Sequence, residues 1–248
     1  MLALSRVALS AMPETQTAIL LYLILSIANF NTLALLKSFE MKTIRVYLTF
    51  VALVCFNVTQ AQQWVSLFDG KSLSDWKVGD NASTFSVDSS MIKVNGNTAH
   101  LFYEGRVNNH NFKNFEFKAE VMTKPHSNSG IYFHTAFQQS GWPQVGYEVQ
   151  VNNSHTDWRR TGSLYGIDDV KEVVSPDNVW FTEYIKVTGN HVIVKINDKT
   201  VVDYTQPSNV PPPGKKGPID SSGTFALQGH DPGSTVYFKN IMVKVLPD

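Results

Sequence analysis

The stretch that decides the fold is residues 128–151, NSGIYFHTAFQQSGWPQVGYEVQV. Its two ends, Ser129–Thr135 and Val145–Val151, alternate apolar with polar side chains and are rich in Tyr, Phe, Ile and Val. Side chains two residues apart on a β-strand point to the same face of the sheet. The pattern therefore predicts two half-buried strands joined by a loop that contains Gly and Pro.

Polar side chains gather on one face of this predicted strand pair. Tyr132 and His134 share a face of the first strand, and Glu148 and Gln150 share a face of the second. If the strands pair, a phenol, an imidazole, a carboxylate and an amide meet on one surface while the other surface builds a core. An ordinary amphipathic hairpin with a solvated outer face gives the same pattern, so both interpretations remain open.

Short alternating segments recur along the chain from about residue 63 to its end, separated by Gly, Asn, Asp and Pro. The longest, Asn114–Thr123, alternates apolar residues with charged ones, as expected for a strand with one buried face. No long helical period and no blade-like repeat occurs. Roughly a dozen short strands with almost no helix predict an all-β fold, an antiparallel jelly-roll β-sandwich.

The N-terminal quarter differs from the rest. A charged start at Met41, an apolar run and small residues before Ala61 predict a secretory signal peptide over residues 41–61. Residues 1–40 are interpreted as upstream sequence translated in error, because an apolar anchor directly before a complete signal peptide makes little sense. The mature domain, residues 62–248, is then expected to be exported, periplasmic or extracellular, and not membrane-embedded.

Charge and cysteine content exclude several classes of protein. The chain has 21 basic and 21 acidic residues and no basic stripe, so nucleic acid is not an expected partner. Cys55 is the only cysteine and lies in the predicted signal peptide, so the mature domain has no disulfide. No Gly-rich phosphate loop, Ser nucleophile elbow or paired-cysteine metal site is present.

Three residues are the candidates for chemistry. His230 alternates with Gln228 on one face of a short predicted strand, and His134 lies beside a glycine on another. With Glu148 the two histidines could form a base and acid set or a three-ligand site for a divalent metal. No metal-specific spacing supports the second reading, so no cofactor is firmly predicted. The alternative for each histidine is an ordinary solvent-exposed position with no catalytic or binding role.

A conventional two-carboxylate glycosidase is disfavoured by the pattern after Glu148. Jelly-roll glucanases commonly place their two catalytic acids at alternating positions of one strand. Here Gln150 and Asn152 occupy the positions where further acids would follow. Acidic residues in the next loop, Asp157 among them, keep that class open.

Several side chains near these strands suit a sugar ligand. Aromatic faces stack on sugar rings, although core or rim packing explains such residues equally well. The expected aromatic contacts are Tyr132, Trp142, Trp158 and Tyr165. The expected contacts to substrate oxygens are Gln150, Gln228, Arg160 and Lys171.

Five motifs carry a resemblance to a known family. In chain order they are Leu67-Phe-Asp-Gly-Lys71 with Trp76, Asn128-Ser-Gly-Ile131, Gly146-Tyr-Glu-Val-Gln150, Gly162-Ser-Leu-Tyr-Gly166, and Leu227-Gln-Gly-His230 followed by Phe238-Lys-Asn-Ile241. Each is weak alone, but together and in this order they resemble the 3-keto-disaccharide hydrolase family. The resemblance covers about residues 63–246.

The resemblance implies a concanavalin A-like lectin/glucanase sandwich, exported by bacteria and often found alongside sugar oxidoreductases. It implies action on small glycosides already oxidised to a ketone at C3. It also makes site positions of Glu148, Gln150, Tyr165 and His230. This chain departs from the family pattern at His134, where many members carry Arg, and at Asn152, where Asp is commoner.

We therefore predict an enzyme that cleaves 3-keto-glycosides or 3-keto-disaccharides by hydrolysis or β-elimination. His134 or Glu148 is the expected base at C2, while His230 with Gln228 holds or protonates oxygens. A non-catalytic carbohydrate-binding module on the same sandwich is the alternative. A conventional glycosidase is a third interpretation, and it requires a second essential carboxylate.

Overall fold

The computed structural model describes residues 18–19, 63–208, 219 and 221–248. The predicted signal peptide over residues 41–61 lies outside the described residues, as does the predicted upstream segment 1–40 apart from residues 18–19. Within the described part of the chain, no helix has the length and apolar character needed to cross a bilayer.

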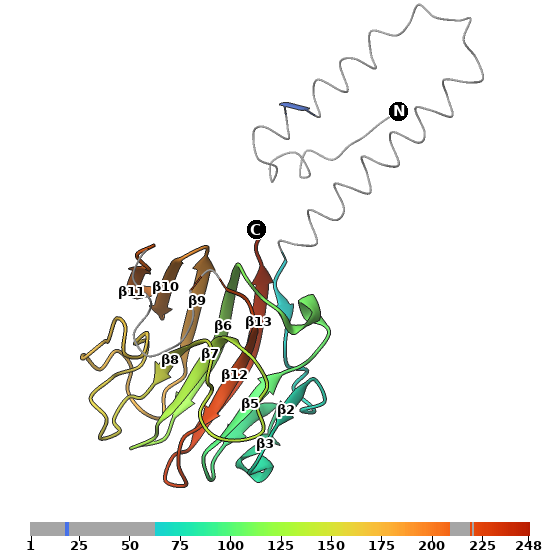
Figure 1. The fold of residues 1–248 in the computed structure, drawn as a ribbon. Helices are drawn as coiled ribbons and strands as arrows, with labels where there is room; N and C mark the ends of the chain where they lie inside the picture. Colours follow the sequence, from blue (N-terminus) through green and yellow to red (C-terminus); the bar gives the residue numbers. More distant parts are fainter. Residues whose placement is uncertain (1–17, 20–62, 209–218, 220) are drawn as a thin grey trace, which may run out of the picture. The chain divides into compact units, whose positions relative to one another are not determined.

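One layer of the fold is an eight-stranded antiparallel sheet (Figure 1). Seven strands follow the order β11-β10-β9-β6-β13-β4-β3, and β1 pairs with β13. The strands are β1 (Val65–Ser66), β3 (Phe85–Asp88), β4 (Met91–Val94), β6 (Phe115–Thr123), β9 (Phe181–Thr188), β10 (His191–Ile196), β11 (Lys199–Thr205) and β13 (Val236–Val245). Two-residue turns with positive φ at both positions, Ser89-Ser90 and Asn197-Asp198, close the β3–β4 and β10–β11 hairpins.

The second layer is a five-stranded antiparallel sheet in the order β2-β5-β12-β7-β8. Its strands are β2 (Trp76–Val78), β5 (Ala99–Tyr103), β7 (Ser129–Thr135), β8 (Tyr147–Val151) and β12 (Thr224–Gly229). Two short 3₁₀ turns, η1 (Ala82–Thr84) and η2 (Val107–His110), lie in the connections. The β7–β8 pair predicted from residues 128–151 is present, with Tyr132 opposite Glu148.

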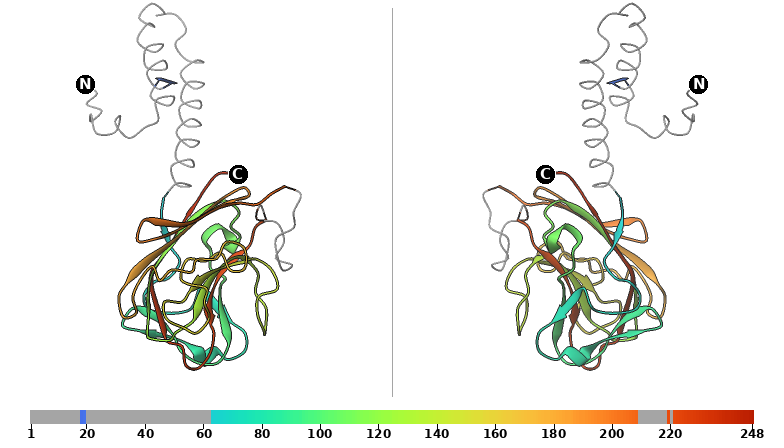
Figure 2. Two further views of the ribbon diagram at one scale, coloured as in Figure 1. Left: turned by 90° about the vertical axis from the view of Figure 1, so that its left-hand side faces the viewer. Right: turned by 90° about the vertical axis from the view of Figure 1, so that its right-hand side faces the viewer.

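Apolar side chains from the two inner faces form one core between the sheets, which lie face to face (Figure 2). Along β6 the side chains alternate between buried and half-buried, as a strand with one solvated face requires. Phe117 of β6 packs on Phe225 of β12, with ring centroids 4.7 Å apart. The predicted all-β, antiparallel sandwich architecture is confirmed.

A β-bulge at the end of β7 interrupts the alternation on which the sequence prediction depended. Ala226 of β12 pairs with Tyr132, but Thr224 pairs with Thr135. The interval therefore holds one more residue on β7 than on β12, which is the definition of a bulge. His134 lies in this interval, with a φ of 53° in the left-handed region.

The bulge turns His134 away from Tyr132. Its imidazole packs edge-on against Phe115 of the opposite sheet, with centroids 5.6 Å apart. Its Nε2 donates a hydrogen bond of 2.9 Å to the carbonyl oxygen of Lys113. The prediction that His134 shares the polar face of Tyr132 is wrong, because side-chain alternation fails where an extra residue enters a strand.

Glycine at position 146 makes room for the bulge. A Cβ at Gly146 would lie 2.5 Å from the carbonyl oxygen of Phe133, and the residue has a φ of 88°. Strand β8 consequently begins at Tyr147, two residues after the predicted start at Val145.

Strand β9 carries one carboxylate into the core. Its inward positions are Phe181, Glu183, Ile185 and Val187. Glu183 is 0 % exposed, and neither carboxyl oxygen has a hydrogen-bond partner among the described residues. Burial raises the pKa of Glu183 well above its ordinary value, so the folded protein favours the neutral acid.

We expect Glu183→Gln to stabilise the protein at alkaline pH by about 1–3 kcal/mol. Because the pKa is higher in the folded state, folding binds a proton above the ordinary carboxyl pKa. Stability is therefore lost as pH rises through the raised value, and the amide removes this loss. Urea unfolding across the pH range measures it, with Glu172→Gln on the surface as the control. A variant as pH-dependent as the wild type contradicts the assignment.

Candidate active site

Polar side chains form rows across the outer face of the five-stranded sheet. Tyr132 of β7 stands opposite Glu148 of β8, and Gln150 stands opposite Gly130 in the next row. A cleft of about 360 Å³ opens over β12, β7 and β8. It is lined by Asn128, Tyr132, Trp142, Pro143, Glu148, Gln150, Asp157, Tyr165, Gln228 and His230.

Glu148 lies at the centre of this cleft and is 6 % exposed. Tyr132 Oη donates to its Oε2 at 2.7 Å, and Gln228 Nε2 donates to its Oε1 at 2.8 Å. A side chain at Gly130 would fill the same space, because a Cβ there would lie 2.5 Å from Glu148 Oε1. The carboxylate is therefore held in a fixed position by donors from two neighbouring strands.

Burial and the charge of Glu148 act together on Tyr132. Burial is the largest cause of the raised pKa of the Tyr132 phenol, and the charge of the neighbouring Glu148 carboxylate raises this pKa further. Tyr132 consequently stays protonated and remains a hydrogen-bond donor to Glu148 over the physiological pH range.

Two buried amide oxygens in the cleft are ready for a ligand. Gln150 Oε1 and Gln228 Oε1 have no hydrogen-bond partner among the described residues, although the amide nitrogens of both side chains are engaged. Gln150 Nε2 donates to Asn128 Oδ1 at 2.9 Å. Buried acceptors without partners are costly unless a ligand or water satisfies them. Hydroxyl groups of a sugar are suitable donors.

His230 and Asp231 form a coupled pair at one end of the cleft. Asp231 Oδ2 accepts a hydrogen bond of 2.8 Å from His230 Nδ1. Partial burial alone would raise the pKa of Asp231, but hydrogen bonds from His230, Ser234 and the Gly233 N–H lower it overall. Asp231 thus orients the imidazole through Nδ1, and Nε2 can exchange a proton or form a hydrogen bond with a ligand.

The metal site predicted from His134, Glu148 and His230 is not assembled, because the bulge takes His134 to another part of the molecule. Among the described residues, His155, His230 and Asp231 bring potential ligand atoms within 4.8 Å of one another. A metal-binding histidine normally donates its second N–H to an acceptor, as His230 does to Asp231. His155 Nδ1 instead accepts the N–H of Asp157 at 3.1 Å. His155 therefore does not fit the usual ligand pattern.

Trp142 forms one wall of the cleft and is 44 % exposed. Its ring packs on His230 and on His100, with centroids 5.5 and 5.4 Å apart. His100 also meets Tyr132 edge to face. Burial, followed by the charge of His230, lowers the pKa of His100 to about 4, so His100 is neutral at physiological pH.

Tyr165 also lines the cleft, and its backbone N–H donates to the carbonyl oxygen of Glu148 at 2.9 Å. The Arg159 guanidinium lies 4.4 Å from the centroid of the Tyr165 ring. Arg159 also forms an ion pair of 3.1 Å with Asp169. These contacts hold the Tyr165 ring in place as a rim for the cleft.

Three residues predicted to contact substrate do not line the cleft. Arg160 Nη1 donates to the carbonyl oxygens of His155 and Asp157, so it holds the loop together. Trp158 and Lys171 are also outside the lining of the cleft, and Lys171 Nζ lies 5.8 Å from the centroid of the Trp158 ring. The predicted substrate contacts of these three residues have no support in the geometry.

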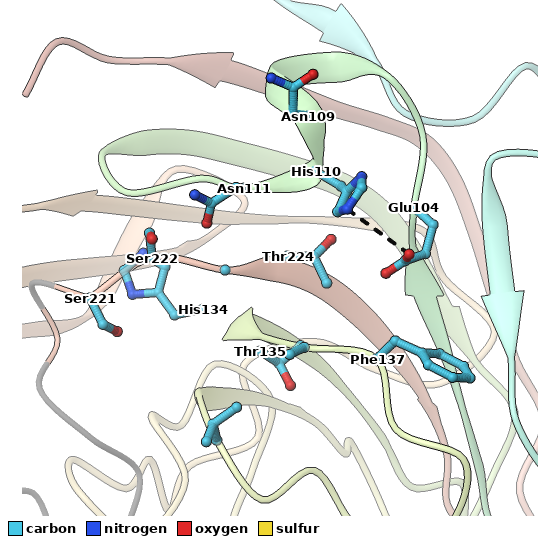
Figure 3. Close-up of a pocket in the computed structure, with 13 residues that line it drawn as sticks. Glu104, Asn109, His110, Asn111, His134, Thr135, Phe137, Ser221, Ser222 and Thr224 are labelled. Atoms are coloured by element: carbon cyan, nitrogen blue, oxygen red, sulfur yellow. Dashed lines mark ion pairs between the residues drawn. The ribbon is translucent and has the colours of Figure 1, made fainter.

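His134 lines a different cavity, of about 550 Å³ (Figure 3). Figure 3 places it beside Ser221 and Ser222. An ion pair of 4.0 Å joins His110 to Glu104 in the same cavity. Because Glu148 does not line this cavity, His134 loses its predicted role as a base beside Glu148.

Several residues in the cleft or in contact with its lining were missed by sequence reasoning. Asp231 stood directly beside His230, and Asn128 began one of the motifs that carried the resemblance, so both had a usable signal. His100 and His155 resembled ordinary strand and loop histidines. Their positions depend on strand register and loop path, which residue spacing does not reveal.

A family model matches most of the chain. The model of the 3-keto-alpha-glucoside-1,2-lyase-like domain matches residues 63–244. The chain belongs to this family. The match spans the described sandwich and confirms the resemblance carried by the five motifs, and it indicates a carbohydrate-active function. No curated protein matches the chain.

Solved structures share the fold. A predicted glycosyl hydrolase from Parabacteroides distasonis is 22 % identical, with a TM-score of 0.62 over 74 % of this chain and 94 % of that one. A galectin-like protein from Bacillus subtilis is 9 % identical, with a TM-score of 0.55 over 73 % and 94 %. The carbohydrate-binding module CBM66 of Bacillus subtilis is 13 % identical, with a TM-score of 0.50 over 68 % and 95 %.

Trp142→Ala is expected to raise the pKa of His100 from about 4 toward its ordinary value of 6.5, because it uncovers the imidazole. Because the pKa of His100 is lowered in the folded state, the wild type loses stability as pH falls from 6.5 to about 4. The variant should lose less stability over the same pH range. NMR titration of the imidazole proton measures the shift. Trp158→Ala is the control, and an unchanged His100 titration in Trp142→Ala contradicts the role of Trp142 as cover.

Proposed function

We propose that this protein cleaves glycosides already oxidised to a ketone at C3, by removing the proton at C2. Membership of the 3-keto-alpha-glucoside-1,2-lyase-like family supports the substrate class. The observation that carries the mechanism is the buried Glu148 carboxylate, fixed by Tyr132 and Gln228 in the floor of the cleft. Such a preorganised base suits proton abstraction from carbon.

Glu148 is the proposed base. The C3 ketone acidifies the hydrogen at C2, and Glu148 accepts that proton while the electron pair forms a C2–C3 double bond and an enolate oxygen at C3. Tyr132 keeps its proton because its pKa is raised, so it remains a donor to the carboxylate during the approach of substrate. His134, the other base considered from sequence, lines a separate cavity.

His230 is the proposed acid for the leaving group. When the enolate collapses, the C1–O bond breaks and the glycosidic oxygen takes a proton from His230 Nε2. Asp231 stabilises the protonated imidazole through Nδ1 at 2.8 Å. Addition of water across the new C1–C2 double bond returns a proton to C2 and a hydroxyl to C1, so the overall reaction is hydrolysis. If the unsaturated sugar is released before water adds, the overall reaction is that of a lyase.

The amide groups of Gln150 and Gln228 are the proposed sugar contacts. Their unpartnered oxygens accept hydrogen bonds from ring hydroxyls, and Trp142 offers an aromatic face to the ring. Tyr165 also lines the cleft. This arrangement holds a sugar with its C2–H near Glu148 without any group that recognises phosphate or nucleic acid.

Asp157 supports a second candidate function, the hydrolysis of an unoxidised glycoside. It is a second carboxylate in the lining of the same cleft. Its Oδ1 accepts the N–H of Arg159 at 3.0 Å and lies 3.9 Å from the guanidinium. A two-carboxylate mechanism would require Asp157 to act on the glycosidic bond. This second function would be distinguished from the first by turnover of an unoxidised glycoside that is lost when Asp157 is replaced.

We also propose that the protein is exported through the signal peptide over residues 41–61 and acts in the periplasm or outside the cell. A sugar 3-oxidoreductase is the proposed partner reaction, because oxidation at C3 must precede the cleavage. Peptide mapping of the natural protein tests the first statement, since the mature chain should begin after Ala61.

Glu148→Gln is expected to lower turnover of a 3-keto-glucoside at least about 10³-fold while binding and unfolding temperature stay near wild-type, because the amide keeps the size but loses the basicity. Release of a chromogenic aglycone and enone absorbance measure both stages. The unoxidised parent glycoside and a chelator-treated sample run beside it.

Glu172→Gln, a surface change, is the matched control and should remain fully active. Full activity in Glu148→Gln contradicts the proposed base. Sugar binding without release from either substrate would identify a carbohydrate-binding module instead.

A further inference from the structure

The loop between β7 and β8, residues 136–146 and here called the strap, passes over the outer face of the five-stranded sheet. In Figure 1 the yellow-green strap crosses in front of β12 and β5. Phe137 of the strap packs edge-on against Phe102 of β5, with ring centroids 5.5 Å apart. Lys77 Nζ lies 3.7 Å from the Phe137 ring on the other side. The strap therefore reaches from the cleft side of the sheet to its β2 edge.

A close backbone contact ties the strap to that edge. The Asp80 N–H donates to the Gln139 carbonyl oxygen at 2.8 Å, and Gln139 Nε2 donates back to Asp80 Oδ1 at 3.0 Å. Glycine is required at position 79, because a Cβ there would overlap the Gln139 carbonyl oxygen. Gly79 and Asp80 thus anchor the strap at Gln139, and we call this contact the Gly79 anchor.

Hydrogen bonds inside the strap fix its shape. Gln138 Nε2 donates to the carbonyl oxygens of Ser140 and Trp142 at 2.7 and 2.8 Å. Gln138 Oε1 accepts the Gln144 N–H at 2.9 Å. This network holds Trp142 upright over His100 and beside His230.

The strap divides the outer face into two unequal halves. Over β12, β7 and β8 the face is open and polar, and it forms the cleft. Over β2 and β5 it carries His100 and Phe102, which are only 4 % and 1 % exposed although they point away from the core. Their cover includes the strap residues Trp142 and Phe137, and a cavity of only about 130 Å³ remains there.

We propose that the strap is the specificity element of this site, and that it restricts the contacts of the cleft to about two sugar units at the end of a glycoside, whatever its total length. An uncovered sheet face would accept a glycan chain lying across all five strands, with aromatic residues on β5 as further stacking positions. Trp142 instead blocks the path toward β5. The proposal rests on the carbohydrate ligand of the proposed function and adds a limit on the length of it that the cleft contacts.

The test compares binding along a ladder of gluco-oligosaccharides from disaccharide to hexasaccharide, measured by calorimetry without turnover. The wild type should bind all lengths within about threefold. Gly79→Ala, which displaces the anchor, and a variant with residues 137–144 replaced by a short Gly-Ser turn should bind the hexasaccharide about tenfold more tightly than the disaccharide. Ser140→Ala is the control inside the strap and should match the wild type.

NMR titration of His100 reports strap displacement independently of any sugar, because uncovering the imidazole returns its pKa from about 4 toward 6.5. A wild type that already gains tenfold along the ladder overturns the proposal. So does a Gly79→Ala protein that uncovers His100 without gaining affinity for long chains. A length limit in binding without cleavage of 3-keto-glycosides would sink the proposed reaction alone. If no variant binds the unoxidised ladder, the length limit is overturned, while aglycone release from 3-keto-glycosides still decides the reaction separately.

Discussion

The fixed position of the Glu148 carboxylate is the constraint on which the outer face of the sheet depends. An ionised carboxylate that is 6 % exposed is tolerated because Tyr132 and Gln228 replace its lost water contacts. Those donors come from β7 and β12, so the charge links three adjacent strands. The pairing of β12, β7 and β8 must therefore be in register before the cleft exists. Gly130 completes the constraint, since its missing side chain is the space that Glu148 occupies.

The bulge at His134 sets the other boundary of the site. It shifts the register of β7 with β12 after Tyr132, and the strap begins just after Thr135, where that pairing ends. The return to β8 at Gly146 is packed against the same bulge, so the two ends of the strap start from one rigid place. A flexible loop could not present Trp142 at a constant angle to the cleft. The strap gains that precision from the bulge at one side and from the Gly79 anchor at the other.

The sequence predicted the elements of this fold well, because alternation along each strand directly reflects a buried and a solvated face. The convergence of Tyr132, Glu148 and Gln150 was one of two interpretations left open by the sequence, and the structure brings these residues together through one hairpin register. His134 was misplaced because a bulge adds a residue without changing composition or hydrophobic pattern. Trp158, Arg160 and Lys171 were misplaced because they sit in an irregular loop, where backbone hydrogen bonds and not periodicity decide direction.

The environments of the two cleft carboxylates separate their roles. Glu148 accepts hydrogen bonds from two neutral donors in a nearly dry position, and these donors hold its carboxylate in a fixed orientation toward the cleft. Asp157 is instead tied to Arg159 through a backbone hydrogen bond and an ion pair, and both involve its Oδ1. In the proposed reaction, acid chemistry at the leaving oxygen falls to His230, whose ring Asp231 orients through Nδ1. A carboxylate base facing an imidazole acid suits elimination from an activated C2 position better than the paired-carboxylate cleavage of an unactivated acetal.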